Sequence, residues 1–469
     1  MSTFAKTFGI ITIASSLLFG QATTSFAIDG LSGGPTEEPA PLVPVGPEFQ
    51  VNTYTPDSQF IPEVAMDEEG NFVAVWESWG DQSNGQDGDW SGIFAQRYDH
   101  RGIPLGVEFQ VNTTHAGGQL DPDVAMDSDG NFVAVWESLD DETSAGIFGQ
   151  RYDQFGNPVG LEFQVNTYTD DWQGAPSVAM SSTGNFVVVW HSWYQDGSSR
   201  GVYGQRYNYT GTPQGPEFQI NTHTDGHQDY PRIAMNDDGD FVVVWPSDGK
   251  DGSQQGISGQ RYDHTGTPEG PEFQVNTTTL NSQTGPVVSM DSEGNITVVW
   301  TSRHNVNARG EGDKTVFGQR YDFTGAPVGS EFPIATDPDV YAGSVGMDDD
   351  GNAWVIVIKK DQNDFDVFMQ GYNPAWALIG PELQVNTFTS DRQTYPKITI
   401  NPNGHAVVAW TSLGQDGDSG GVFAQRYTPN WAPTCDNATP VPSTLFSNDH
   451  AFHSIDIANV TDPDGDPVR

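Results

Sequence analysis

Cysteine and positive charge are both scarce in this chain of 469 residues. The one cysteine, Cys435, excludes a framework of internal disulfide bonds. Only 19 Lys and Arg stand against 63 Asp and Glu, so the formal net charge is −44. A surface of this sign repels nucleic acid and anionic lipid, which excludes both as partners. It suits a saline medium or divalent cations, and charge alone does not choose between these two explanations.

Long hydrophobic runs are missing as well. Beyond the N-terminus, no stretch approaches the ~20 apolar residues that a membrane helix needs. Residues 1–27 combine Lys6, the short apolar stretch FGIITIASSLLFG and the small-residue end SFA, which together predict a cleaved secretory signal peptide. Residues 28–45 are rich in Gly and Pro and predict a linker. We therefore expect a secreted or cell-surface protein with no membrane insertion.

Recognisable catalytic motifs are lacking too. The sequence has no nucleophile elbow, no His-Glu-x-x-His, no phosphate-binding glycine loop and no Cys–His arrangement. Carboxylates are abundant, but no spacing singles out an acid–base pair. The sequence alone therefore leaves the question of an enzyme open and leans towards a non-catalytic protein.

What the chain has is an internal repeat. The unit EFQVN and its variants recur with their Glu residues 60, 54, 55, 55, 59 and 51 positions apart. Each full period holds a short apolar piece such as PEVAM, a glycine turn, a run such as FVVVW, a variable polar loop, and a segment such as GIFGQRY. These short β-branched and aromatic runs, bounded by Gly, Pro, Asn and Asp, predict four strands per repeat. The repeated Glu residues are Glu48, Glu108, Glu162, Glu217, Glu272, Glu331 and Glu382.

The ends of the repeat predict how the fold closes. The FVVVW runs are apolar on both faces, so both faces must be covered, as they are between the blades of a β-propeller. The first EFQVN has no strands before it, and the last QRY, at 425–427, has no EFQVN after it. We predict an all-β, seven-bladed β-propeller of four-stranded blades over residues 46–427. The N-terminal strand Glu48–Asn52 joins the last blade and closes the ring. An open solenoid is the alternative, but the sequence shows no capping repeats for one.

Three residue types recur at fixed places in the repeat. We expect the tryptophans to pack between blades, the arginines to pair with the Glu of EFQVN, and the glutamines to bond loop backbone, a repeated binding pocket being the alternative for the glutamines. Ile358 and Gly371 replace the Trp and the Arg in the sixth repeat, where the Gln is also missing. The recurring residues are Trp76, Trp136, Trp190, Trp245, Trp300 and Trp410; Arg97, Arg151, Arg206, Arg261, Arg320 and Arg426; and Gln59, Gln119, Gln173, Gln228, Gln283 and Gln393.

The variable loops predict the functional face. In a four-stranded meander, the loops after the second and fourth strands share one end, and loops on a rigid scaffold carry binding groups. Non-repeated aromatic residues gather in these loops among Asp, Asn and Gln, a combination that suits sugar recognition. The alternative is that the rings pack the loops onto the blades. The predicted ligand-binding residues are Trp79, Trp90, Trp172, His191, Trp193, Tyr194, His223, His227 and Tyr230.

Two acidic loops predict a possible role for calcium, the one cofactor we expect. QDGDWSG contains Asp87 and Asp89, and QDGDSGG contains Asp416 and Asp418. Their oxygens suit calcium, although the spacing of a known calcium loop is incomplete and solvated turns are the alternative.

The C-terminal residues 428–469 leave the repeat. They resemble the opening of an immunoglobulin- or cadherin-like module, with VTDPDGDPV as the most specific part. The resemblance implies calcium ligands at Asp462, Asp464 and Asp466. Only about 35 residues match a sandwich of roughly 100, so we expect a truncated module after a linker, with Cys435 paired in the missing part. Residues 46–427 resemble repeat propellers of exported bacterial proteins of uncharacterised function.

These observations favour a monomeric, non-catalytic binding or adhesion protein that recognises an extracellular glycan or a surface protein through its variable face. Two alternatives stay open: a multivalent carbohydrate-binding lectin, and a polysaccharide-degrading glycosidase or lyase. A fold alone does not choose among them.

Overall fold

The computed structural model describes residues 39–430 apart from 81–84, 115–116, 142–143, 305–311, 338 and 362–363, together with 439–440 and 457–458. Within these residues every regular element is a β-strand. A search of the same residues finds no helix with the length and hydropathy to cross a membrane. The expected signal peptide, Cys435, Asp462, Asp464 and Asp466 lie outside the described residues.

The strands repeat in the predicted order. The first strands are β2 (Ser58–Met66), β6 (Gln119–Met126), β10 (Gln173–Met180), β14 (Arg232–Met235), β18 (Gln283–Met290), β22 (Val340–Met347) and β26 (Gln393–Ile400). The second strands are β3 (Phe72–Trp79), β7 (Phe132–Asp141), β11 (Phe186–Trp193), β15 (Phe241–Asp248), β19 (Ile296–His304), β23 (Ala353–Asp361) and β27 (Ala406–Leu413). The third strands are β4 (Ser91–Tyr98), β8 (Ser144–Tyr152), β12 (Arg200–Tyr207), β16 (Gln255–Tyr262), β20 (Asp313–Tyr321), β24 (Asp364–Tyr372) and β28 (Gly420–Pro429).

Fourth strands complete the sheets. They are β5 (Phe109–Gln110), β9 (Phe163–Gln164), β13 (Phe218–Gln219), β17 (Phe273–Gln274), β21 (Pro327–Ala335) and β25 (Leu378–Gln384). In the described residues, five separate four-stranded sheets run from β6–β9 to β22–β25, and one eight-stranded sheet holds β26–β28, β1 and β2–β5. A single parallel bridge, Ser58–Gly420, joins the two halves of that eight-stranded sheet. The short pair β29 (Thr439–Pro440) and β30 (Ile457–Ala458) lies apart in the sequence.

The N-terminal strand pairs with the end of the last repeat. β1 (Leu42–Gln50) runs antiparallel to β28, with Leu42 opposite Pro429 and Phe49 opposite Ala424. This strand therefore begins inside the stretch 28–45 that the sequence predicted to be linker. It also begins before Glu48, because its first residues pair with 426–429, from the Arg of QRY to two residues past its Tyr.

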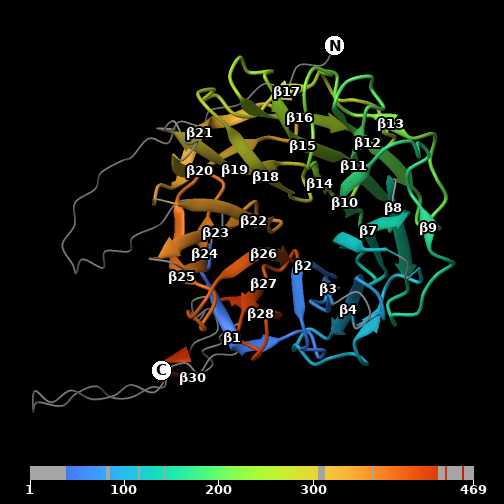
Figure 1. The fold of residues 1–469 in the computed structure, drawn as a ribbon. Helices are drawn as coiled ribbons and strands as arrows, with labels where there is room; N and C mark the ends of the chain where they lie inside the picture. Colours follow the sequence, from blue (N-terminus) through green and yellow to red (C-terminus); the bar gives the residue numbers. More distant parts are fainter. Residues whose placement is uncertain are drawn as a thin grey trace, which may run out of the picture. The chain divides into compact units, whose positions relative to one another are not determined.

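The sheets follow one another around a central space (Figure 1). Each first strand contacts the first strand of the next sheet, from β2 to β6 and onward to β26, and β26 contacts β2. Repeated four-stranded sheets in this arrangement resemble the blades of a propeller.

The tryptophans pack between neighbouring sheets, as the sequence predicted. Trp76 is fully buried and shares a hydrophobic cluster with Val407, Ala409 and Val422 of β27 and β28. The other five are also 0–1 % exposed. In the sixth repeat the Trp position is held by Val357 and not by Ile358, because Val357 faces Phe368 as Trp76 faces Phe94.

The predicted pairing of the repeated arginines with the Glu of EFQVN is wrong in the described residues. Arg426 of β28 donates to the carbonyls of His100 and Arg101 in the turn after β4, at 2.6 and 2.5 Å. Glu48 instead accepts from Thr387 N at 2.6 Å. Elsewhere the Arg and the Glu are close along the chain, as Arg97 and Glu108 are, but Arg97 donates to the carbonyl of Gln154 in the turn after β8 of the next sheet. Each arginine thus ties its sheet to the turn of the next one.

The repeated glutamines bond loop backbone, as predicted. Gln59 is fully buried and donates to the carbonyl of Pro56 at 2.8 Å, while its Oε1 accepts from Asn52 at 3.0 Å. Asn52 Oδ1 in turn accepts from Val422 N at 2.7 Å. This Asn–Gln pair holds the loop between one sheet and the next, which fixes the backbone at the variable face.

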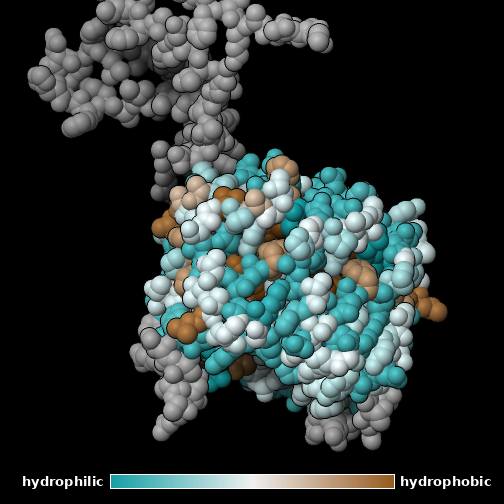
Figure 2. Space-filling model, turned by 90° about the horizontal axis from the view of Figure 1, so that it is seen from above, coloured by the Kyte–Doolittle hydropathy of each residue, from teal (hydrophilic) through white to brown (hydrophobic). Residues whose placement is uncertain are grey.

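The face of the molecule seen in Figure 2 is largely hydrophilic, with scattered apolar residues. Exposed apolar side chains include Val107 and Leu161, at 83 and 88 % exposure. Isolated residues of this kind are normal on a soluble surface and indicate no docking site by themselves.

Candidate functional site

The first strands are bent where they enter the variable face. The register of β6 against β7 shifts between Leu120 and Asp123, and Asp121 has a positive φ of 47°. Equivalent shifts and positive φ values occur at Ile61, Ala175 and Tyr395. Such β-bulges re-aim side chains, and non-glycine residues at positive φ cluster at functional sites.

Buried carboxylates gather behind these bends. Glu77 and Glu137 each directly follow a repeated Trp, and they are 1 and 4 % exposed. Glu77 Oε2 accepts from Asp121 N at 3.3 Å, and Glu137 Oε2 accepts from Ala175 N at 3.2 Å. Each Glu therefore joins the bend of the next sheet. We call Glu63, Glu77, Asp121 and Glu137 the carboxylate cluster.

The members of the carboxylate cluster have different electrostatic surroundings. Burial, together with the charge of Asp121, raises the pKa of Glu137 to about 8. Burial raises the pKa of Glu77 well above its usual range, with Asp121 and Glu137 adding repulsion. Burial raises the pKa of Asp121 too, but Arg232 and Lys397 oppose that shift. Glu137 is thus protonated at neutral pH, whereas Asp121 has cations nearby that favour its ionised form.

One further carboxylate completes the cluster. Glu63 Oε1 lies 2.6 Å from Lys397 Nζ, an ion pair between β2 and β26. Burial raises the pKa of Glu63 to about 7 despite the opposing charges of Lys397 and Arg232. An anionic group that reached this cluster would therefore find Lys397 and Arg232 beside it.

Half-exposed tryptophans flank the carboxylate cluster. Trp172 is 42 % exposed and hydrogen bonds to Glu137. Trp79 Nε1 donates to Glu77, and its ring lies 5.6 Å edge-on from Trp90, which is 41 % exposed. Three of the predicted ligand-binding residues thus lie at the margin of one polar site, with part of two rings open to solvent.

A second group of predicted residues forms the aromatic cluster, defined as His191, Trp193, Tyr194, His227 and Tyr230. Trp193 lies 5.6 Å from Tyr194 and 6.3 Å from His227, and His191 lies 5.4 Å from Tyr230. Tyr194 and Tyr230 are 54 and 51 % exposed, both at positive φ. The rings thus meet from two adjacent sheets.

Polar groups hold the aromatic cluster together. Arg200 lies 4.3 Å above the Trp193 ring and 2.5 Å from Asp229. His227 Nδ1 is 3.0 Å from Ser199 Oγ. His191 is 4 % exposed, and burial lowers its pKa to about 3, so the ring is neutral. His223 is held separately, with Nε2 3.3 Å from the carbonyl of Asp248.

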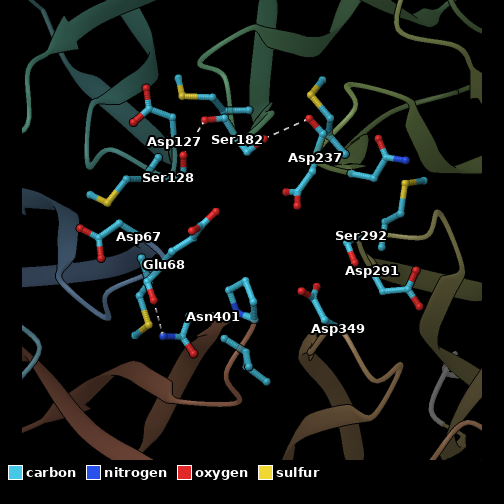
Figure 3. Close-up of a pocket in the computed structure, with 18 of the residues that line it drawn as sticks. Asp67, Glu68, Asp127, Ser128, Ser182, Asp237, Asp291, Ser292, Asp349 and Asn401 are labelled. Carbon is cyan, nitrogen blue, oxygen red and sulfur yellow. Dashed lines mark hydrogen bonds between the residues drawn. The ribbon is translucent and has the colours of Figure 1, made fainter.

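A central cavity lies at the opposite end of the sheets. It measures about 160 Å³ and is lined by residues from the ends of the first strands and the glycine turns that follow them. Figure 3 shows the side chains of Glu68, Asp237 and Asp349 around the hollow. Burial raises the pKa of Asp237, and Asp349 and Glu68 add to the shift. The hollow thus lies on the regular face, away from the loops in which we predict the functional site.

The aspartates of the two acidic loops accept hydrogen bonds from loop backbone. Asp87 Oδ1 and Asp416 Oδ1 accept from the backbone two residues on, at 3.0 and 3.1 Å, in tight turns. Asp418 Oδ2 accepts from Asp57 N at 3.1 Å. No group of three or more His, Cys, Asp or Glu in the described residues is arranged to hold a metal ion. A metal there would therefore need amide or hydroxyl ligands as well.

Sequence reasoning missed the carboxylate cluster and its cations. A signal was present, because the residue after the repeated Trp varies as Glu77, Glu137, His191, Pro246, Thr301 and Thr411 while the Trp itself does not. A variable charged residue inside an otherwise apolar strand indicates a site.

Comparisons with known proteins show a limited likeness. No family model matches the chain, and no curated protein matches it. Similar solved structures include a protein of unknown function from Dyadobacter fermentans, with 9 % identity, a TM-score of 0.47, and coverage of 83 % of this chain and 99 % of that one. The polysaccharide lyase Uly1 has 12 % identity, a TM-score of 0.49, and coverage of 78 and 90 %. An α-L-arabinanase from Penicillium chrysogenum has 13 % identity, a TM-score of 0.44, and coverage of 83 and 98 %. The function proposed below rests on the site and not on these likenesses.

Proposed function

We propose that this protein binds polysaccharide at its variable face and cleaves it at the carboxylate cluster. The proposal rests on one observation. Glu137 and Asp121, carboxylates with different surroundings, lie between half-exposed tryptophans and two cations. Structures seldom group carboxylates at such a desolvation cost without a functional need.

Chemistry follows from the two environments. Neighbouring carboxyl groups in different surroundings are suited to separate acid and base roles. Glu137, protonated at neutral pH, has the state required of a general acid that donates to a leaving oxygen. Asp121, where Arg232 and Lys397 oppose the rise in pKa that burial causes, is the candidate for a base or for a group that stabilises positive charge. The indole of Trp172 offers a face on which a sugar ring stacks.

The proposal also includes the number of blades and the way the ring closes. We infer seven blades, the seventh built from β26, β27, β28 and β1, so that the ring closes between Leu42–Gln50 and Gly420–Pro429. The β1–β28 pairing and the contact of β26 with β2 support this. Export by the expected signal peptide, and action as a monomer on extracellular glycan, belong to the proposal as well.

The experiment is a panel of neutral and anionic polysaccharides incubated with the protein. Reducing ends and the ultraviolet absorbance of unsaturated products are followed, so that hydrolysis and elimination are distinguished. We expect product from at least one polymer, and a loss of at least 100-fold in rate for Glu137→Gln and Asp121→Asn. Glu69→Gln, an exposed glutamate on the opposite face, is the matched control. Full activity in Glu137→Gln refutes the assignment.

Non-catalytic glycan binding is the second candidate, and the aromatic cluster favours it. Tyr194 and Tyr230 hold exposed rings at positive φ, and Arg200 and His227 contact the ring of the neighbouring Trp193. A glycan array with wild type, Tyr230→Ala and Trp193→Ala tests it. Binding without any product, lost in both variants, favours a lectin or adhesion protein over an enzyme.

A further inference from the structure

A short loop recurs at the variable end of three sheets with the same unusual features. Gln-Asp-Gly occurs at 86–88, 195–197 and 415–417. In each copy one carboxylate oxygen of the Asp closes a tight turn. The other, Oδ2, is buried and has no hydrogen-bond partner among the described residues, and neither has Oε1 of the preceding Gln. A buried acceptor without a partner is costly, so three copies indicate an occupant.

A glycine beside each of these Asp oxygens leaves room that a side chain would fill. A Cβ added to Gly92 would lie 2.9 Å from Asp87 Oδ2, and one on Gly201 or Gly421 would lie 2.7 Å from the Oδ2 of that loop's Asp. Each glycine faces a serine across the sheet, so both point to the same side. These serines are Ser78, Ser192 and Ser412, all 0 % exposed and all with Oγ unpartnered in the described residues.

Two other sheets fill the equivalent place with an ammonium group. In the loop after β15, Lys250 stands where the Gln stands elsewhere, and its Nζ bonds Glu272. In the lysine-free loops the Gln amide bonds the matching Glu, as Gln195 does with Glu217 at 2.6 Å.

The sixth repeat also places a lysine ammonium group beside its Glu, but this lysine comes from another position. Lys359 occupies the serine position and faces Asp366, which occupies the glycine position. Lys359 Nζ lies 2.7 Å from Glu382 Oε1 and 2.9 Å from Asp337. Two unrelated substitutions therefore bring a cation to the Glu at the same position of the repeat, Glu272 and Glu382.

We propose that the three lysine-free loops each bind a calcium ion where the other two sheets use lysine. Asp87 Oδ2, Gln86 Oε1 and Ser78 Oγ, and their equivalents, supply hard oxygen ligands of the kind that calcium takes. The ion offsets the charge of the Asp. It also fixes the variable loops that carry Trp90 and Tyr194.

Calcium titration of the full chain after EGTA treatment tests this, by calorimetry and by melting temperature, without any polysaccharide. Asp87→Asn, Asp196→Asn and Asp416→Asn keep the Oδ1 that closes the turn and remove the charge. We expect each to bind one calcium fewer than wild type, and the triple variant three fewer. Asp251→Asn, in the loop that carries Lys250, is the matched control and should bind as wild type does.

The outcomes are decisive either way. Calcium that raises the melting temperature of wild type but not of the triple variant supports the sites. Equal stoichiometry in wild type and triple variant, or an equal loss in Asp251→Asn, overturns them, and water is then the occupant. Neither result bears on polysaccharide cleavage, which is measured separately.

Discussion

Replacing Glu137 by Gln should stabilise the protein in a way that depends on pH. Burial raises the pKa of Glu137 from 4.5 to about 8, so the folded state holds a proton that the unfolded state releases between these values. The unfolded state binds fewer protons in this window, and the free energy of unfolding therefore falls as pH rises through it. At about 1.4 kcal/mol for each pH unit, ionised Glu137 costs the fold about 5 kcal/mol above pH 8.

Glutamine removes that cost and keeps the key contact. Its Oε1 still accepts from Ala175 N, as Glu137 Oε2 does at 3.2 Å. Removing the charge also relieves repulsion on Asp121 and Glu77, which acts in the same direction. We expect Glu137→Gln and wild type to differ by less than about 1 kcal/mol at pH 4.5, because both carry a neutral side chain.

Urea unfolding followed by tryptophan fluorescence at pH 4.5, 7 and 9 measures the difference. The variant should gain stability steadily, reaching as much as about 5 kcal/mol at pH 9. Glu69→Gln, exposed on the opposite face, should show no such trend. A variant less stable than wild type at pH 9, or a difference that does not change with pH, refutes the reasoning.

Other consequences are simpler to test. Arg426→Ala should lower the free energy of unfolding by about 2 kcal/mol, because two charge-assisted hydrogen bonds to the carbonyls of His100 and Arg101 disappear. Glu48→Gln should lower it by less, because the remaining side-chain oxygen can still accept from Thr387 N. Val51→Asp should lower the melting temperature sharply, since Val51 is 1 % exposed and its backbone bonds β28. Val107→Asp, at a site 83 % exposed, should leave the melting temperature unchanged. Equal melting temperatures of the two variants would contradict closure by the N-terminal strand.

Much of the fold could be predicted from the sequence because each repeat contains short apolar runs of strand length bounded by turn residues. The Trp that ends each FVVVW run is predicted to be buried, and Trp76 and its equivalents are fully buried. The repeated Gln could be predicted to bond loop backbone, but its hydrogen bond to the Asn of EFQVN was not predicted. The N-terminal strand was expected beside the last repeat, but its start at Leu42 was not, because Pro and Gly in this stretch read as linker.

The site was harder to predict because its contacts run between sheets. The arginines were assigned to a Glu nearby in sequence, whereas they bond turns 58 to 62 residues ahead in the middle of the chain. Glu77 and Glu137 looked like ordinary polar residues after an apolar run. Only the bend of the next sheet, at Asp121 and Ala175, shows why each is buried. The aromatic residues were found because loops with several rings are rare in so polar a chain.

The central claim is that the carboxylate cluster cleaves polysaccharide, and the most direct measurement is the pH dependence of product release by wild type and by Glu137→Gln on the polymer that the panel identifies. The account predicts activity in wild type that falls as pH rises past about 8, where Glu137 loses its proton, and a loss of at least 100-fold in the variant at neutral pH. No product from any polymer, or a variant as active as wild type across this range, would contradict it.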